Sequence, residues 1–453
     1  MTKEPPSRGR ETIELPAVGI GLHRPSHWGL ARPRVPAEKE RAKEPPMAEP
    51  AHRYDVIIAG GGPVGLTMAL SLARFMDGIR IALIDRRDFT VPRDQRASAL
   101  SAGVRRVFEA LGVWEAVAAE AQPILAMKIT DSGTGDLARP LFLSFAGEVA
   151  PGEPFAHMVP NRTLLAALLK AIEGKVELVA PVEILSSAVT AGAATLRLAD
   201  GRELSAPLLI AADGARSALR ERAGIGVVAH DYRQSGIVTT IAHSLPHQGV
   251  AYEHFRPAGP FASLPLPGNR SSLVWTEATA AAQRFKAMPQ EEVAGIIEAV
   301  MGSSLGTVTL EEGLQVFPLQ LQLARAFVAP RLALIGDAAH VVHPVAGQGL
   351  NLGLKDVAAL AELVVETMRL GLDPGAPDVL ARYQRWRRLD TTLLALVTDG
   401  MNRLFSNDIA PIRAARDLGL GIVDRLPVVK TAMIRQAAAL NANAPRLLSG
   451  QPI

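Results

Sequence analysis

The sequence predicts an α/β protein in which a parallel-sheet domain, assembled from separated segments, is combined with an inserted β-sheet domain and a C-terminal helical segment. Residues 54–84 carry the strand–helix–strand pattern that opens a parallel sheet. Apolar strands return at 208–212 and 331–335, and residues 235–276 are rich in Pro, Gly and β-branched residues, which is typical of a mixed or antiparallel sheet. Since single cores stop growing at about 250–300 residues, a chain of 453 residues is expected to form two or three substructures.

The first strand–helix–strand unit follows from its apolar pattern. Tyr54–Ala59 is a short β-branched run typical of a buried parallel strand, Val64–Phe75 has apolar residues at helical spacing, and Ile79–Ile84 is the second strand. The uncharged run 56–73 is long enough for a membrane span. Its glycine triplet and following proline favour a strand, a loop and a helix instead, so we expect no transmembrane helix.

Later elements alternate between helices and hairpins. Amphipathic patterns predict helices at 102–117 and 161–173, the second with Asn161 as its N-cap. Short alternating runs broken by glycine predict hairpins over 176–210. The pattern is helical again at 350–370 and stays so towards the C-terminus.

The composition is that of a globular protein, with 48% hydrophobic and 21% charged residues and no cysteine. The lack of cysteine excludes thiol redox chemistry and disulfides. Residues 1–46 hold nine Lys/Arg and six Asp/Glu and supply the whole net charge of +3, so we expect no nucleic-acid partner. Residues 1–50 lack hydrophobic periodicity and are expected to be a disordered extension. Met47 is an alternative start, which leaves open whether residues 1–46 are translated.

A glycine-rich loop follows the first strand. Gly60 permits a tight turn, Gly62 lets a pyrophosphate approach the backbone, and Gly65 lets the helix pack close to the strand. The amide end of the helix then faces the phosphates. Asp85 ends the second strand about 20 residues later, where an acid binds ribose hydroxyls. This spacing predicts a dinucleotide site.

Two later segments extend this site. Asp213 follows the strand at 208–212 and by itself would be an ordinary turn residue; together with the other segments it is a second contact in the phosphate region. Gly336 and Asp337 follow the strand at 332–335, and ligands bind at this end of open α/β sheets. A carboxylate there suits the ribityl chain of a flavin.

The third segment continues into a helix with a glycine-rich start. Reduced flavin is an anion with charge near the pyrimidine edge of its ring, and helix amides stabilise such charge. The loop and first helical turn expected around the ring consist of Pro344, Gly347, Gln348, Gly349, Leu350 and Asn351.

Two histidines in the third segment lie three residues apart. His340 and His343 have no further ligands at suitable spacing, so we expect no metal site and interpret His340 as a structural hydrogen-bonding residue. Motifs of serine hydrolases, P-loop nucleotidases and zinc proteases are absent from the sequence, which leaves those functions without support.

The three segments, YDVIIAGGGPVGLTMALSLA, AADGARSALR and LALIGDAAHVVHPVAGQGLNLG, resemble those of single-component class A flavoprotein aromatic hydroxylases over roughly residues 53–430. Within that class, Asp94–Ser101, Gly259–Leu266, Leu273–Thr276 and Tyr383–Arg388 are similar to the ubiquinone-biosynthesis hydroxylases.

The resemblance implies noncovalent FAD, reduction by NAD(P)H or another external donor, and O2 as co-substrate. A flavin C4a-hydroperoxide then hydroxylates an electron-rich phenol, with no protein base required. Asp85 stands where many relatives have Glu, which preserves the carboxylate. The implied cofactor-binding residues are Gly60, Gly62, Gly65, Asp85, Arg96, Arg162, Asp213, Gly336, Asp337, Gly349, Leu350 and Asn351, with Pro344, Gly347, Gln348 and Gly349 as the catalytic loop at the ring.

The expected fold is therefore a Rossmann-like FAD-binding domain of the glutathione-reductase type with an inserted substrate domain. The FAD-binding domain is expected at 51–125, 156–224 and 315–370, the substrate domain at 126–155 and 225–314, and the C-terminal helices at 371–453. Alternating sheet positions would present five residues to the ring, although a place in the sheet core explains them equally well: Phe255, Phe261, Leu264, Pro265 and Trp275.

A polyprenylated phenol substrate implies contact with a membrane surface. The segment 426–440 mixes apolar and basic residues as an interfacial helix does, but a helix packed on the body or on another subunit explains it too. We expect a cytoplasmic protein, peripheral on the inner face of the membrane, with other ubiquinone-biosynthesis enzymes as further partners. Hydroxylation of a small soluble phenol and saturation of a prenyl chain remain alternative reactions.

Overall fold

The structure is a computed structural model, and residues Glu49–Ile453 form one compact unit. Three predictions lie outside the described residues: the disordered extension, the loop residue Pro344 and the interfacial segment 426–440. The described residues are 52–91, 96–131, 143–146, 148–343, 347–405 and 443–453.

A six-stranded sheet carries the glycine-rich loop and is parallel apart from one edge strand. All residues of its central strands are buried, as expected for apolar strands covered on both faces. The predicted parallel strands are confirmed. In spatial order the strands are β11 (Glu177–Val179), β3 (Ile81–Ile84), β2 (Val56–Ala59), β15 (Leu208–Ala211), β23 (Leu332–Leu334) and the antiparallel β22 (Val328–Ala329).

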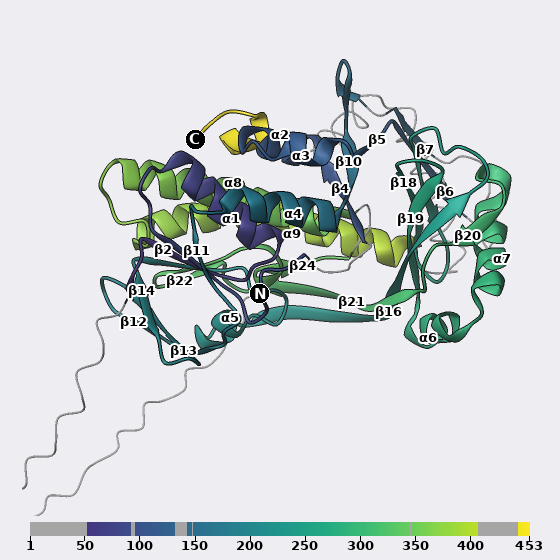
Figure 1. Cartoon of the computed structure of the whole chain (residues 1–453). Coiled ribbons are helices and arrows are strands. Elements are labelled where there is room, and N and C mark those ends of the chain that lie inside the picture. Colours follow the sequence, from purple (N-terminus) through teal and green to yellow (C-terminus); the bar gives the residue numbers. More distant parts are fainter. Residues whose placement is uncertain (1–51, 92–95, 132–142, 147, 344–346, 406–442) are drawn as a thin grey trace, which may run out of the picture. The chain divides into compact units, whose positions relative to one another are not determined.

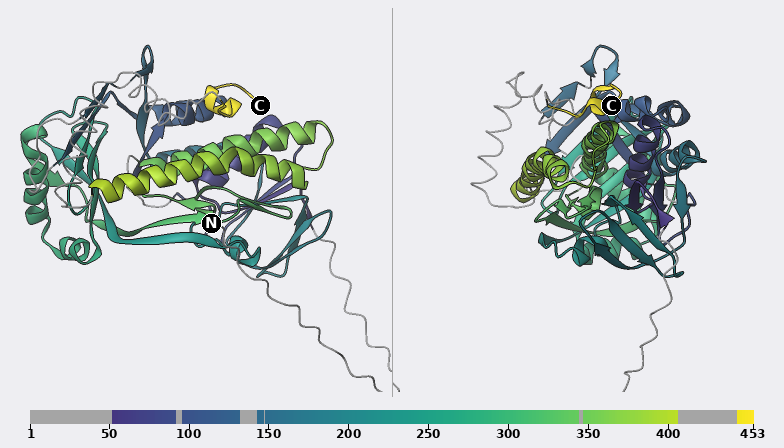
Figure 2. Two further views of the ribbon diagram at one scale, coloured as in Figure 1. Left: turned by 180° about the vertical axis from the view of Figure 1, so that it is seen from behind. Right: turned by 90° about the vertical axis from the view of Figure 1, so that its left-hand side faces the viewer.

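Helices pack over this sheet. α1 (Pro63–Phe75) contacts both α4 (Asn161–Ile172) and α8 (Gln348–Arg369), and the long α9 (Pro377–Phe405) runs beside α8 (Figures 1 and 2). α8 confirms the helix predicted at 350–370 and is buried along most of its length. It can approach α1 because Gly353 has no side chain: a Cβ there would lie 2.9 Å from Val64 Cγ2.

Two details of the helix predictions are wrong. The helix expected at 102–117 is divided into α2 (Ala102–Ala110) and α3 (Trp114–Ala118), because Gly112 between them takes φ +72°. Asn161 is not an N-cap. Pro160 occupies the cap position, and Asn161 Oδ1 accepts a hydrogen bond from Ser98 Oγ at 2.7 Å.

A nine-stranded mixed sheet forms the other large layer and confirms the sheet predicted over 235–276. The helices α6 (Thr279–Ala287) and α7 (Gln290–Met301) pack on one of its faces. In spatial order its strands are β24 (His340–Val341), β21 (Gln315–Ala324), β16 (Val227–His243), β19 (Arg270–Ala278), β18 (Phe261–Leu266), β17 (Val250–Phe255), β6 (Ala126–Asp131) and β7 (Leu143–Ala146), with β20 (Val308–Leu310) paired to β16.

The long antiparallel pair β16 and β21 links the nine-stranded sheet to the nucleotide-binding part (Figure 1). β21 and β24 belong to the segment 315–370, so this segment contributes strands to both large sheets. The domain boundaries stay a prediction.

Three smaller sheets complete the unit, and one of them confirms the hairpins predicted over 176–210. They are β1 (His52–Arg53), β14 (Glu203–Ala206), β13 (Ala194–Leu198) and β12 (Ile184–Val189); β4 (Ala97–Ser101), β10 (Ala156–Pro160) and β5 (Gln122–Ile124); and β8 (Glu148–Ala150) with β9 (Glu153–Pro154). The remaining short helices are α5 (Ala218–Arg222) and 3₁₀ turns at Gly302–Ser304, Gly336–Ala338 and Arg446–Ser449.

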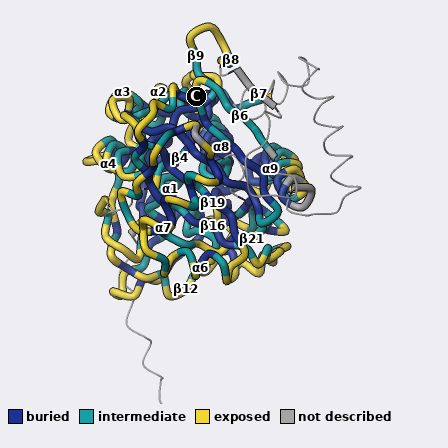
Figure 3. Tube along the Cα trace, turned by 90° about the vertical axis from the view of Figure 1, so that its right-hand side faces the viewer, coloured by how far each residue is buried: buried dark blue, intermediate teal, exposed yellow. Residues whose placement is uncertain are grey.

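Burial follows this layering. Figure 3 shows dark, buried trace along α1, α8 and β4, with exposed residues on the outer helices and loops. The main apolar core joins the six-stranded sheet to α1, α4 and α8, and a separate core lies between the nine-stranded sheet and α6 and α7. Within the described part of the chain, no helix has the length and apolar character needed to cross a bilayer.

The close approach of α8 to α1 can be tested with two helical glycines. We expect Gly353→Ala to lower the free energy of unfolding by about 1–3 kcal/mol, because the added methyl group meets Val64 and the Gly336 backbone. Gly400→Ala in α9 is the matched control: its Cβ meets nothing within 4 Å, so we expect it to stabilise by roughly 0.5–1 kcal/mol. Urea unfolding measures both, and equal effects would contradict the packing argument.

Candidate active site

The three sequence motifs meet at the carboxyl edge of the parallel sheet. Neighbouring strands hydrogen-bond there: Gly60 N–H donates to Ile84 O at 2.7 Å, Ala212 N–H to Ala59 O at 2.7 Å, and Ile335 N–H to Ala211 O at 3.0 Å. Asp213 and Gly336 are the next residues along their strands. The structure therefore brings the beginnings of all three segments together at the edge where ligands bind in open α/β sheets.

The glycine-rich loop has the geometry of a phosphate cradle. A Cβ on Gly60, which takes φ +115°, would lie 2.2 Å from Ala212 O, and one on Gly65 would lie 1.9 Å from Gly60 O. A Cβ on Gly62 would meet no atom within 4 Å, so the backbone there is open. No side chain caps the first turn of α1, which leaves its amide groups for a phosphate.

Asp85 fixes this loop from the end of β3. Its Oδ2 accepts the Gly61 N–H at 2.7 Å and its Oδ1 accepts the Arg87 N–H at 2.9 Å. The carboxylate side chain is 13% exposed. It can therefore orient the loop and still meet a ribose hydroxyl.

Two carboxyl groups follow the other strands. Burial raises the pKa of Asp213, despite hydrogen bonds that lower it, and Oδ1 of this residue has no hydrogen-bond partner. Burial also raises the pKa of Asp337, opposed by His340. Buried polar atoms in native proteins are normally paired, so the orphaned Asp213 oxygen fits a site that receives a polar ligand.

The N-terminus of α8 is the second exposed helix end at the site. Gly347 caps it with φ +63° and without a side-chain hydrogen bond, and a Cβ on Gly349 would meet nothing within 4 Å. Asn351 instead bonds to protein: its Oδ1 accepts the Ser101 N–H at 2.9 Å and its amide donates to Ala99 O at 2.7 Å. Its side chain thus joins α8 to β4, while the backbone of the first turn faces the open side.

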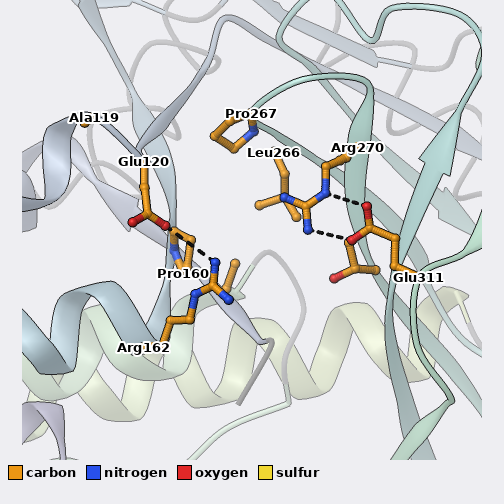
Figure 4. A pocket seen from close by; sticks show the side chains of 10 residues that line it. Ala119, Glu120, Pro160, Arg162, Leu266, Pro267, Arg270 and Glu311 are labelled. Atoms are coloured by element: carbon orange, nitrogen blue, oxygen red, sulfur yellow. Dashed lines mark hydrogen bonds and ion pairs between the residues drawn. The ribbon is translucent and has the colours of Figure 1, made fainter. Parts of the chain in front are cut away.

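Arg96 and Arg162 lie at the side of the site. The Arg96 guanidinium stacks over the Phe317 ring, 5.1 Å from its centroid. Arg162 points across to Glu120 at 3.8 Å and lines a cleft of about 220 Å³, whose opposite wall carries the Arg270–Glu311 ion pair (Figure 4). The cofactor-binding role of these two arginines stays a prediction.

The sequence analysis missed the buried charge network behind the third segment. Asp356 on α8 is fully buried and accepts hydrogen bonds from Gly336 N at 3.0 Å, His340 Nε2 at 2.5 Å and Arg387 Nε at 2.8 Å. Burial alone would raise the pKa of Asp356, but His340 and Arg387 overcome this effect and hold it below its ordinary value. An acidic residue inside the apolar pattern of 350–370 was the available signal.

The two histidines have different surroundings. His340 is the structural hydrogen-bonding residue that we expected, since it binds Asp356. His343 is fully buried, and burial lowers its pKa to about 4. Among the described residues neither of its ring nitrogens has a hydrogen-bond partner, and its ring packs edge-on against Tyr232.

The five expected substrate residues lie on two opposite faces of the nine-stranded sheet. Leu264 packs with Ala99 and Met158 on the face towards β4 and β10. Phe261 and Trp275 belong to the core under α6 and α7, where Trp275 packs against Phe285. Because strand residues alternate between faces, Pro265 shares the side of Phe261. Phe255, by alternation from Ala251, shares the side of Leu264.

Taken together, the donor set fits FAD. Two helix N-termini without side-chain caps, an open backbone at Gly62 and Gly349, and carboxyl groups at three strand ends suit a pyrophosphate, a ribose and a ribityl chain. The apolar face around Leu264 lies beside β4, next to the start of α8.

Comparison with known proteins agrees with this geometry. The FAD binding domain family matches residues 53–392. Ubiquinone hydroxylase UbiL of Rhodospirillum rubrum is 44% identical over 88% of this chain and 93% of its own length. The 3-demethoxyubiquinol 3-hydroxylase of Escherichia coli is 35% identical over 85% of this chain and 98% of its own length. The crystal structure of p-nitrophenol 4-monooxygenase PnpA from Pseudomonas putida DLL-E4 has the same fold, with TM-score 0.72 at 18% identity over 85% of this chain and 99% of that chain.

The open backbone at Gly62 predicts a binding defect without a folding defect. Gly62 has φ −77° and free space around its Cβ position, so Gly62→Ala should change the free energy of unfolding of the apoprotein by less than about 0.5 kcal/mol. We expect its FAD affinity to fall by at least roughly tenfold, since the methyl group occupies the approach of the pyrophosphate. Titration of the apoprotein with FAD, followed by flavin fluorescence, measures this affinity. An affinity equal to that of the wild type would refute the placement of the pyrophosphate at Gly62.

The buried network predicts an acid-sensitive loss of stability. Asp356→Asn removes the buried carboxylate at Arg387 Nε and leaves Arg387 with Asp390 as its remaining anionic partner, so it should cost about 3 kcal/mol at neutral pH, the lower end for a broken buried pair. Because folding lowers the pKa of Asp356, its contribution is present above the unfolded pKa of about 3.9 and is lost as the pH falls through the folded value. Urea unfolding at pH 7 and at a series of pH values from 4 down to 2 tests this, with the exposed-turn variant Asp200→Asn as control.

Proposed function

The chain belongs to the family of FAD-dependent ubiquinone-biosynthesis hydroxylases, and from this premise we propose that its substrate is a polyprenylated phenol whose aromatic ring it hydroxylates. The protein is a flavin-dependent monooxygenase that uses FAD, O2 and an external reductant. The observation that carries the proposal is the position of the α8 N-terminus beside an apolar sheet face.

When bound, FAD supplies the reduction of O2 and the transfer of one oxygen atom to the ring. The chain's own residues bind and orient the reactants. The amide groups of Gly349 and Leu350, in the first turn of α8, stabilise negative charge at the pyrimidine edge of a flavin. Asp337 accepts hydrogen bonds from ribityl hydroxyls, and the loop at Gly60–Gly65 binds the pyrophosphate.

The apolar face of the nine-stranded sheet excludes water from the ring. Ala262, Leu264 and Leu266 on β18 form this face together with Ala99 and Met158. A dry site strengthens electrostatic interactions and protects reactive oxygen species from water. Leu264 is the expected substrate contact that this arrangement supports most directly.

The prenyl chain is supported by the relatives. The R. rubrum and E. coli proteins are named for ubiquinone and demethoxyubiquinol, both of which carry prenyl chains on their rings. Hydroxylation of a small soluble phenol and prenyl-chain saturation are the rival reactions, and the identity of the product separates all three.

Membrane contact is supported by one exposed stripe. Leu389, Leu393 and Leu396 on α9 are 67%, 52% and 63% exposed, and they follow one another at helical spacing. Arg385 and Arg388 on the same helix are exposed as well. An apolar stripe beside basic residues suits the interface of an anionic membrane, where a prenylated substrate resides.

The proposed function predicts a specific metabolic defect. Deletion of the gene in its host should cause a prenylphenol that lacks one or more ring hydroxyl groups to accumulate, which mass spectrometry detects and which identifies the carbon. Purified FAD-loaded protein should convert a short-chain prenylphenol to a product heavier by one oxygen atom. A product heavier by two hydrogens would support the saturating reductase, and unchanged quinone without a redundant hydroxylase would refute the pathway.

A further inference from the structure

Glu253 is a buried carboxyl group on the sheet face that the proposed reaction uses. It lies in the middle of β17, opposite Ala262 of β18 and Ile129 of β6. Cross-strand partners share a face, and Ala262 packs with Leu264 and Ala99. The next residue, His254, pairs with Phe261 on the opposite face. The register therefore directs Glu253 to the side of β4 and β10.

This face is next to the start of α8. A Cβ on Gly347 would lie 3.4 Å from the Ala99 Cβ. Asn351 joins the same strand to α8 by hydrogen bonds to Ala99 and Ser101. The start of α8, whose amides would hold a flavin, thus lies next to β4, and β4 packs on the sheet face that carries Glu253.

The Glu253 carboxyl group has no protein partner. No hydrogen bond or ion pair joins it to any other described residue, and the side chain is only 4% exposed. The neighbours of Glu253 on this face, which come from β18, β6, β4 and β10, are apolar. Asp131, which pairs with Phe255, is the next residue along β6 on the same face. Burial alone raises the pKa of Glu253 to about 7.

Glu277 shows what a purely structural buried glutamate looks like in the same sheet. It lies on the face towards α6 and α7, where its Oε1 accepts hydrogen bonds from Arg256 Nη1 and Trp275 Nε1, both at 2.8 Å. Glu253 lacks such donors. Buried carboxyl groups without partners are costly and rare outside ligand sites, so its partner is expected to be a ligand.

We propose that Glu253 binds the phenol hydroxyl of the substrate and accepts its proton during hydroxylation. The inference rests on the proposed function and assigns to Glu253 a proton-accepting role that the flavin mechanism itself does not require. The phenol O–H bond breaks as the Glu253 carboxylate gains the proton. The oxygen electron pair left behind enriches the ring carbons that are attacked. When the product ring becomes aromatic again, its ring proton passes to the second oxygen atom of O2, which leaves as water, and Glu253 returns its proton to the product oxygen, so Glu253 gains and loses one proton in each turnover.

The test is single-turnover hydroxylation by FAD-loaded protein across pH. Chemically reduced holoenzyme is mixed with O2 and 2-prenylphenol, and product per flavin is measured by mass spectrometry. The carboxylate form is the active one, so the wild-type rate should rise with pH through about 7. Glu253→Gln should remove this rise and lower the single-turnover rate at saturating substrate and pH 8 on the order of 100-fold, while the substrate concentration that gives half of this rate changes far less. Glu253→Asp should restore part of the pH-dependent rate.

A second readout is independent of activity. The folded pKa of Glu253 lies above its ordinary value, so the folded protein holds this proton more tightly than the unfolded chain and loses stability as the pH rises from about 4.5 through 7. Glu253→Gln should lack that loss, so its Tm relative to wild type should increase between pH 5.5 and pH 8.5. Glu277→Gln is the control: it should lower Tm at both pH values and keep the wild-type pH profile of hydroxylation.

The outcomes separate the two proposals. Hydroxylation by wild type together with an unchanged pH profile and rate in Glu253→Gln would overturn the role of Glu253 and leave the proposed function standing. A pH-dependent Tm difference between Glu253→Gln and the wild type, without an effect on the rate, would also overturn the proposed role of Glu253. Such a result would show that the Glu253 carboxyl group affects stability only. Wild-type protein that hydroxylates no prenylphenol would overturn both.

Discussion

The buried Asp356 carboxylate joins the elements on which the active site depends. It binds the Gly336 amide at the end of β23, His340 at the start of β24 and Arg387 on α9, while its own backbone belongs to α8. Burying a carboxylate costs several kcal/mol unless partners compensate, and here the Arg387 guanidinium and hydrogen bonds from His340 and the Gly336 amide provide the compensation. The network therefore sets where α8 lies relative to the carboxyl edge of the sheet, and so where its N-terminal amides point.

Three other carboxyl groups in the protein behave in the opposite way. Asp213, Asp337 and Glu253 have raised pKa values because burial is not balanced by strong cationic partners. Asp356 is bound by Arg387 and His340 and has a lowered pKa. The carboxyl groups thus have two different roles. Asp356 is a charged structural group behind the edge of the sheet, and Asp213, Asp337 and Glu253 are the hydrogen-bond acceptors that we assign to ligands. This separation is a common feature of active sites.

Most of the nucleotide-binding part could be predicted from the sequence because its determinants are local. A buried parallel strand is a short apolar run, and a phosphate loop needs glycine at fixed spacing, which Gly60 and Gly65 show through contacts that no side chain would permit. The orientation of Phe261 and Trp275 could not be predicted, because a one-residue change of register moves a side chain to the other face. The prediction that Asn161 caps its helix was wrong for a related reason. The Asn161 side chain accepts a hydrogen bond from Ser98, which lies on a strand that the local sequence does not reveal.

The sequence by itself determined the cofactor class, since this depends on residue types at short, fixed spacings, and it indicated the reaction chemistry through the resemblance of the three motif segments to a known family. Only the tertiary structure decided which residues share a face or a charge network. Asp356 and Arg387 are 31 positions apart, and Glu253 meets the β4 side of the site through strand pairing alone. Such relations arise from register and from the packing of helices on sheets, and these are set by the whole fold and not by any local pattern.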